Sequence, residues 1–123
     1  DLIEFLRSEG EPGGYTNYWV AYPLAFLSDE TLIYVPRLPY HQDFRYTPRD
    51  DRYPPYSEVV TQAERVAYIT TRHSALDDRL REGFTELGVS FREIAIGDYH
   101  VFYSLSRAVR PDLLSLDSEA PQP

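Results

Sequence analysis

Several residue types that carry chemistry in other proteins are missing from this chain. It contains no cysteine, which removes disulfide bonds, thiolate catalysis and cysteine-ligated metal sites together. Lysine is absent too, so all 12 basic residues are arginine and the lysine of a phosphate-binding P-loop is missing. No apolar run reaches the roughly 18 residues that cross a bilayer, and we expect no signal peptide. Methionine is absent even at position 1, so we expect a mature form or a fragment of a larger protein.

The balance of charge argues against polyanionic partners. The chain has 20 acidic residues against 12 basic ones, a net charge of −8. Nucleic acids and anionic membrane surfaces are both bound through basic faces. We therefore exclude nucleic acid as a partner and expect a soluble domain with an acidic exterior.

The order of strand and helix patterns predicts the fold class. Helical patterns cover 1–10, 17–27, 57–65 and 74–87, and strand patterns cover 14–16, 31–35, 66–70, 90–96 and 99–106. Strands that alternate with helices form parallel pairs through right-handed crossovers. We predict an α/β fold, a Rossmann-like three-layer sandwich with a mostly parallel sheet and a C-terminal antiparallel hairpin. Residues 1–107 form this single domain, and residues 108–123 form a poorly ordered tail.

Two helices have features that can be checked residue by residue. The first follows Asn17 as its N-cap, and Pro23 predicts that it is kinked or starts late. Its expected inward residues are Trp19, Tyr22, Phe26 and Leu27. The second begins with a capping box over Ser74 to Asp77, and apolar residues at helical spacing follow before a terminating glycine. The apolar residues are Leu76, Leu80, Phe84 and Leu87, and the terminating glycine is Gly88.

None of the ionisable residues has the spacing of a known catalytic or metal site. His41, His73 and His100 are far apart, without H-x-x-x-H or H-E-x-x-H spacing. The paired carboxylates, at 50–51 and 77–78, are explained by salt bridges and by a helix N-terminus. No G-x-S-x-G elbow occurs. We predict no catalytic, cofactor or metal site. A hydrolase that uses Asp50, Asp51 or Glu58 near His41 is the weakest of the alternatives.

The segment from Pro36 to Tyr56 is the strongest candidate for a binding site. Its prolines prevent a regular helix or central strand, and it mixes tyrosine rings with arginine forks. Such a mixture binds sugars, polar head groups or a partner, whereas the alternative is a loop that covers the sheet. His73, at a strand-to-helix junction, is also part of this candidate surface. The alternative is that His73 is a solvent-exposed histidine of a loop. The predicted ligand or partner surface contains Tyr40, His41, Arg45, Tyr46, Arg49, Arg52, Tyr53, Tyr56 and His73.

The aromatic residues also form a pattern that resembles a known family. Residues 14–22 read GYTNYWVAY, residues 26–28 read FLS, and residues 52–56 read RYPPY. This pattern, over roughly Leu2 to Arg107, resembles the soluble C-terminal region of multi-pass bacterial membrane proteins of the dolichyl-phosphate-mannose–protein mannosyltransferase-like kind. The resemblance implies a domain after the last membrane span, on the extracytoplasmic face of a bacterial membrane.

The resemblance also implies what this domain does. Such enzymes use a polyprenyl-phosphate sugar donor and carry their catalytic acid between early spans, a position that no residue here matches. The implied role is a non-catalytic accessory domain of a membrane glycosyltransferase-like protein. Its partners would be the rest of the parent chain and a carbohydrate or polyprenyl-linked acceptor. The alternative is a free-standing module that binds a sugar or sugar phosphate, with residues 36–56 as a lid.

Overall fold

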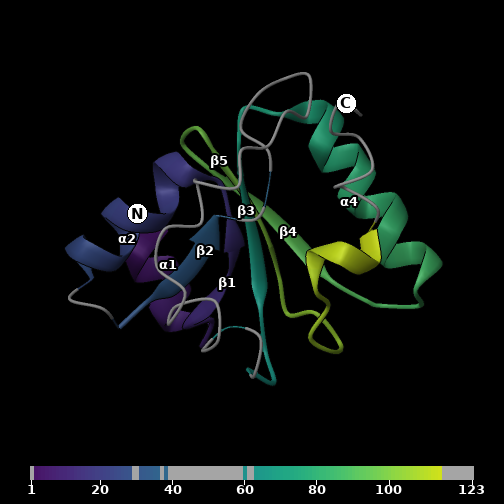
Figure 1. The fold of residues 1–123 in the computed structure, drawn as a ribbon, viewed down its shortest axis with the longest axis horizontal. Helices are drawn as coiled ribbons and strands as arrows, with labels where there is room; N and C mark the ends of the chain where they lie inside the picture. Colours follow the sequence, from purple (N-terminus) through teal and green to yellow (C-terminus); the bar gives the residue numbers. More distant parts are fainter. Residues whose placement is uncertain (1, 29–30, 37, 39–59, 61–62, 115–123) are drawn as a thin grey trace.

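The computed structural model describes residues 2–28, 31–36, 38, 60 and 63–114. Helices and strands alternate along most of this part of the chain (Figure 1). The predicted helix over 57–65 lies largely outside these residues, and Ala63 to Arg65 are not helical. In order, the elements are α1 (Leu2–Ser8), β1 (Gly13–Thr16), α2 (Tyr18–Leu27), β2 (Ile33–Pro36), β3 (Ala67–Thr71), α4 (Ser74–Glu86), β4 (Arg92–Ile96), β5 (Tyr99–Tyr103) and the 3₁₀-helix η2 (Pro111–Leu114).

The five strands form one mixed sheet in the order β2-β1-β3-β5-β4. β1 pairs in parallel with β2 and β3, whereas β5 pairs antiparallel with β3 and β4. The α/β class and the C-terminal hairpin are confirmed. The expectation of a mostly parallel sheet is wrong, because β5 inserts between β3 and β4 and makes two of the four pairings antiparallel.

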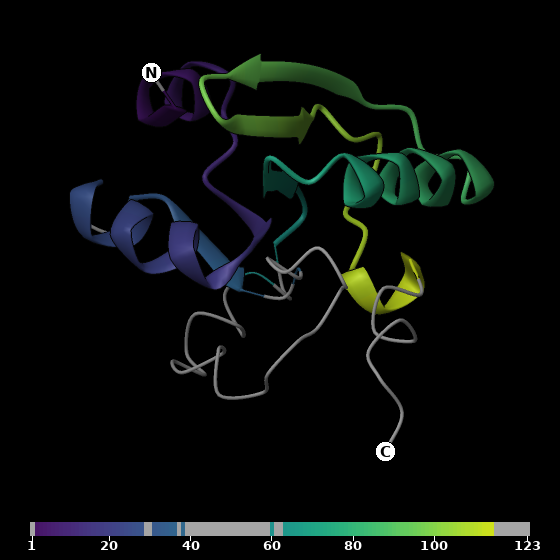
Figure 2. The same ribbon diagram turned by 90° about the horizontal axis from the view of Figure 1, so that it is seen from above.

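Helices cover both faces of this sheet (Figure 2). On one face, buried residues of α1 and α2 pack with Ile69 and Val101. On the other face, α4 and η2 pack with Tyr68 and Phe102. Neighbouring strand residues thus serve opposite cores, as the period of two in a strand requires.

Helix α2 presents a different face to the core than the sequence predicts. Asn17 caps it as expected, since its Oδ1 accepts a hydrogen bond from the Val20 N–H at 3.1 Å. The helix begins directly at Tyr18 and includes Pro23, so the late start is wrong. Phe26 and Leu27, expected inside, are 82% and 69% exposed. Among the α2 side chains that the structure describes, which leave out Trp19 and Tyr22, the buried ones are Val20, Ala21, Leu24 and Ala25.

Helix α4 forms as predicted, but its cap lies one residue earlier. Leu76, Leu80 and Phe84 are buried, and Gly88 has a φ of 72° just beyond the helix end. The N-cap is His73, not Ser74, because the His73 Nδ1 accepts the Leu76 N–H at 3.2 Å.

Gly14 allows β1 to lie unusually close to β3. A Cβ at this position would lie 1.9 Å from the Ala67 carbonyl oxygen, far inside van der Waals contact. Glycine is therefore required here for packing, as in other close approaches of two backbones.

The packed fold extends beyond residue 107. Val109 and Leu114 are buried in the core under α4, and the Tyr68 hydroxyl donates a hydrogen bond to the Val109 carbonyl. The predicted tail thus starts too early, since Val109 and Leu114 belong to the core; residues 115–123 lie outside the described part.

Candidate functional site

Most of the predicted binding surface lies outside the described residues. The structure therefore gives no positions for its tyrosine, histidine and arginine side chains. It gives none for the hydrolase candidates Asp50, Asp51 and Glu58 either. These surface residues are Tyr40, His41, Arg45, Tyr46, Arg49, Arg52, Tyr53 and Tyr56.

His73 is the one described member of that surface, and it is buried. Only 1% of the residue is exposed, so the alternative of a solvent-exposed loop histidine is wrong. Its Nδ1 accepts a hydrogen bond at the α4 N-terminus, which places the proton of a neutral ring on Nε2. In the described part of the chain, His73 serves as a helix cap.

The carboxyl ends of β1 and β3 form the edge where α/β sheets bind ligands. The chain leaves β1 into α2 on one face and leaves β3 into α4 on the other, which makes a topological switch point. Polar side chains there hold the strands together. The Thr16 hydroxyl donates to the Ile69 carbonyl at 2.9 Å, and the Asn17 amide donates to Thr71 Oγ1 at 3.0 Å.

An exposed ion pair joins this edge of the sheet to the hairpin turn between β4 and β5. The Arg72 guanidinium lies 2.7 Å from the Asp98 carboxylate, and the Arg72 N–H donates to the Asp98 carbonyl at 3.2 Å. Arg72 has a φ of 47°, an uncommon conformation for a residue with a side chain. The turn itself contains Gly97 with a φ of 60°, as the predicted Gly97-Asp98 hairpin requires.

A network of charged side chains joins α4 to the hairpin. Arg81 donates to Glu93 and Asp78, and His100 Nε2 lies 2.8 Å from Glu93 Oε1. The Arg81 hydrogen bond, helped by His100, holds the pKa of Glu93 below its usual value, although partial burial opposes the shift. Arg81 also lies over the Phe102 ring at 5.7 Å. Each charged group has a partner within the network, so a structural role accounts for it.

Asp77 has a structural role as well. It is buried in the first turn of α4, and the Thr70 hydroxyl of β3 donates to its carboxylate at 2.5 Å. The helix N-terminus explains the pair Asp77-Asp78 in the sequence, and the structure adds this bond from Asp77 to the sheet.

Glu11 is a buried carboxylate that sequence analysis missed. Its Oε2 accepts hydrogen bonds from the Arg65 guanidinium at 2.9 Å and from the Ser104 N–H at 2.8 Å. Its Oε1 is buried and has no hydrogen-bond partner in the described structure. Burial, followed by the charge of Glu11, raises the pKa of nearby Tyr34 well above its usual range. Because these partners are 54 and 93 residues away along the chain, no local signal marks Glu11 as buried.

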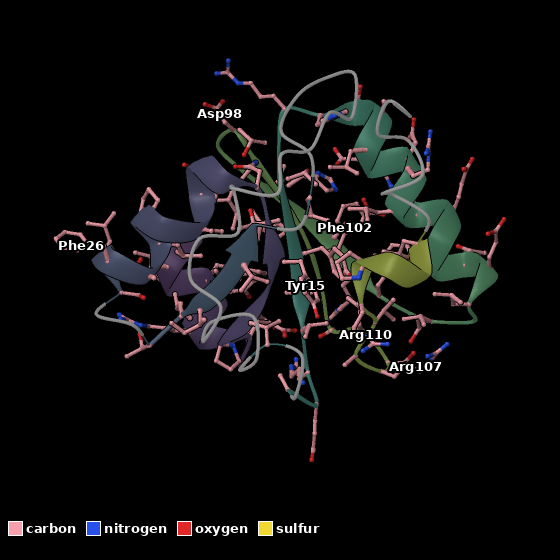
Figure 3. The ribbon with its side chains drawn as sticks, viewed as in Figure 1. Tyr15, Phe26, Asp98, Phe102, Arg107 and Arg110 are labelled. Atoms are coloured by element: carbon pink, nitrogen blue, oxygen red, sulfur yellow. The ribbon has the colours of Figure 1, made fainter. Side chains whose placement is uncertain are left out.

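An apolar surface on α2 is the second feature that sequence analysis missed. Phe26 projects from the end of α2, away from the sheet (Figure 3), and Leu27 and Pro23 are exposed beside it. An apolar pocket of about 220 Å³ adjoins them. We call the three exposed residues and this pocket the α2 surface. Its pocket is lined by Leu2, Ile3, Val20, Pro23, Leu24, Leu27 and Tyr99.

A second apolar pocket, of about 200 Å³, lies at the N-terminal end of β1. Val60 and Ala63 in its lining flank two residues that the structure does not describe. Its described lining is Pro12, Gly13, Thr31, Ile33, Val60, Ala63 and Arg65.

Among the described residues, no three histidine or carboxylate side chains lie close enough to hold a metal ion. None of the helices in the same ranges is long and apolar enough to cross a membrane.

No family model matches this chain. Neither a curated protein nor a solved structure matches it either. The charged groups described above hold the fold together, whereas the α2 surface exposes apolar area that the fold does not use.

Proposed function

We propose that this chain is a non-catalytic accessory domain that acts by binding a partner or ligand. The observation that carries the proposal is the exposure of Phe26 and Leu27 beside an apolar pocket. Contiguous exposed apolar surface marks sites of interaction with proteins, membranes or ligands. The described charged groups support the same conclusion, because the arrangements around Glu11, Asp77 and Glu93 join secondary-structure elements.

We propose further that the domain belongs to a membrane glycosyltransferase-like protein and lies on the extracytoplasmic face of a bacterial membrane. The support is the aromatic motif, whose stretches 14–22 and 26–28 fall mainly in β1 and α2, whereas 52–56 lie outside the described residues. Gly14, the first residue of the motif, allows the close approach of β1 to β3. The partners would be the rest of the parent chain and a carbohydrate or polyprenyl-linked acceptor.

The parent protein can be tested by sequencing the gene upstream of residue 1. The proposal predicts a continuous reading frame that encodes several hydrophobic spans. A start codon directly before residue 1 would contradict it. A protease-accessibility assay on intact and permeabilised cells would then test the side of the membrane.

A second candidate function is the binding of a sugar or sugar phosphate at the carboxyl ends of β1 and β3. The observation in its favour is the topological switch point between these strands, with helices that begin at both. In this function the arrangement is Rossmann-like with three layers; the lid expected from the sequence, residues 36–56, lies almost wholly outside the described residues. A panel of sugars and sugar phosphates, titrated while the emission of Trp19 is followed, tests it. A flat response across the panel would count against this function.

A further inference from the structure

Strand β4 forms one edge of the sheet, and in the described structure no strand pairs with its outer side. Its one neighbour in the sheet is β5, and no described element lies beyond it (Figure 2). The first four of its five residues are exposed. An edge strand presents a row of unpaired N–H and C=O groups to which another strand can bond. The outer side of β4 is therefore a candidate interaction surface.

The hairpin between β4 and β5 determines which backbone groups point outward. Its turn has two residues, so the residues that flank the turn, Ile96 and Tyr99, form a hydrogen-bonded pair. Such pairs alternate along an antiparallel ladder, so every second residue from Arg92 to Ile96 bonds to β5. The N–H and C=O groups of Glu93 and Ala95 point away from β5. In the described part of the chain, no backbone bond from a loop or turn reaches either residue.

The side chains of β4 differ between its two faces. Ile94 lies opposite Val101, a residue of the core under α1 and α2, and 37% of Ile94 is exposed. On the other face, Glu93 accepts hydrogen bonds from Arg81 of α4 and lies 2.8 Å from His100. The edge thus has an apolar residue at its centre and a carboxylate that is already paired within its own chain.

This pattern is complementary to itself. Two β4 strands can pair antiparallel about a twofold axis that passes through Ile94. Glu93 of each copy then lies opposite Ala95 of the other copy, and their outward N–H and C=O groups bond across the axis. Arg92 lies opposite Ile96, so no charged residue faces a charge of the same sign. The two Ile94 side chains meet in a non-hydrogen-bonded pair, the position where side chains of neighbouring strands are closest.

Neighbouring registers fit less well. An axis through Glu93 sets the two Glu93 carboxylates opposite each other, and like charges at such positions destabilise a sheet. An axis through Ala95 carries the pairing into the hairpin turn, where Asp98 is already paired with Arg72. The axis through Ile94 pairs all five residues of β4.

From this geometry we infer that β4 is a homodimer interface, at which two copies of the chain join their sheets edge to edge. The inference goes beyond the proposed binding function, and it does not depend on the α2 surface. A strand of five residues gives a small interface, so the dimer is weak and its population rises with protein concentration. Each copy has a net charge of −8, and this repulsion is screened by salt. Added salt should therefore strengthen the dimer.

Disulfide trapping tests the interface, because the chain contains no cysteine of its own. Ile94→Cys sets two thiols opposite each other at a Cα separation of about 4.5 Å, which a disulfide can span. Ala95→Cys is the matched control on the same strand, since its two thiols lie on diagonal positions roughly 7–8 Å apart. With oxidised glutathione as the oxidant, Ile94→Cys should form the covalent dimer at least about tenfold faster than Ala95→Cys.

Hydrogen exchange in the unsubstituted chain gives a second measurement that needs no variant. The amide protons of Glu93 and Ala95 should exchange at least about threefold more slowly at millimolar than at micromolar protein concentration, because the dimer protects them. The amides of Ile94 and Ile96 bond to β5 in the monomer, so their exchange should not depend on concentration in this way.

Three results would overturn the inference. Equal cross-linking rates for Ile94→Cys and Ala95→Cys would show that random collisions form the disulfide. Faster cross-linking of Phe26→Cys than of Ile94→Cys would assign self-association to the α2 surface. Exchange at Glu93 and Ala95 that is independent of concentration would show that the edge of β4 stays unpaired. The proposed binding function would stand after any of these results, because it rests on other residues.

Discussion

Replacing Gly14 with alanine tests how the fold brings β1 against β3. The new Cβ would lie 1.9 Å from the Ala67 carbonyl oxygen and 2.6 Å from the Ala67 nitrogen. Both are backbone atoms, so a comfortable contact of about 3.5 Å requires the strands to separate by at least about 1.5 Å. The ladder between them covers two residue pairs. Losing about two hydrogen bonds, at roughly 1 kcal/mol each, and overpacking the site, at roughly 1–3 kcal/mol, gives about 3–5 kcal/mol.

That loss is large against the 5–15 kcal/mol, in rough terms, that stabilises a typical domain. Urea unfolding followed by far-ultraviolet circular dichroism measures it. Gly83→Ala in α4 is the matched control, because its Cβ would meet the movable tip of Leu114 at 2.6 Å. A gain in helix propensity of up to about 1 kcal/mol opposes that contact, so the control should lie within about 1 kcal/mol of wild type. If Gly14→Ala is equally close to wild type, the described approach of the strands is wrong.

Three other variants test separate parts of the fold. Thr70→Val should lower the free energy of unfolding by about 1–3 kcal/mol, because it removes a donor from the buried Asp77 carboxylate; no change on urea unfolding would contradict this bond. Leu114→Ala should cost about 2–3 kcal/mol in the same assay if η2 completes the core, whereas a tail residue would cost nothing. Glu93→Gln should lower stability at neutral pH by about 0.5 kcal/mol, a small effect because the ion pair is partly exposed to solvent. Since the folded-state pKa of Glu93 is lowered, its contribution is present above pH 4.5 and lost as the pH falls through the folded pKa, so unfolding curves of wild type and Glu93→Gln should converge in acid.

Helix α4 shows what periodicity can predict. Leu76, Leu80 and Phe84 recur at helical spacing between charged residues, so the buried side is unambiguous. The cap is harder to predict, because it depends on which polar side chain reaches a free N–H. Ser74 and His73 are both suitable by type, and the fold selects His73.

Helix α2 shows where periodicity fails. Since it is apolar throughout, no polar residue indicates which side faces water. Phe26 and Leu27 were expected inside for their size. The core instead buries Val20 and Leu24, which lie one turn apart, whereas Phe26 faces away from them and Leu27 lies at the exposed end of the helix. The candidate surface was missed for the same reason.

Glu11 shows a different limit. A glutamate beside Pro12 is typical of a surface turn, and only the tertiary fold brings Arg65 and Ser104 to its carboxylate. The parallel half of the sheet followed from the alternation of strands and helices. The insertion of β5 beside β3 did not, because strand order depends on contacts between distant segments.

A map of backbone amide chemical shifts tests the central claim, that the domain binds a partner through the α2 surface. The chain would be titrated with a synthetic helical peptide of leucine and lysine and, separately, with the sugar and sugar-phosphate panel. The account predicts that the peptide gives its largest shifts at residues 20–27 and at Leu2 and Ile3. Largest shifts at residues 71–73, from the peptide or from a sugar phosphate, would move the binding site to the edge of the sheet and contradict it.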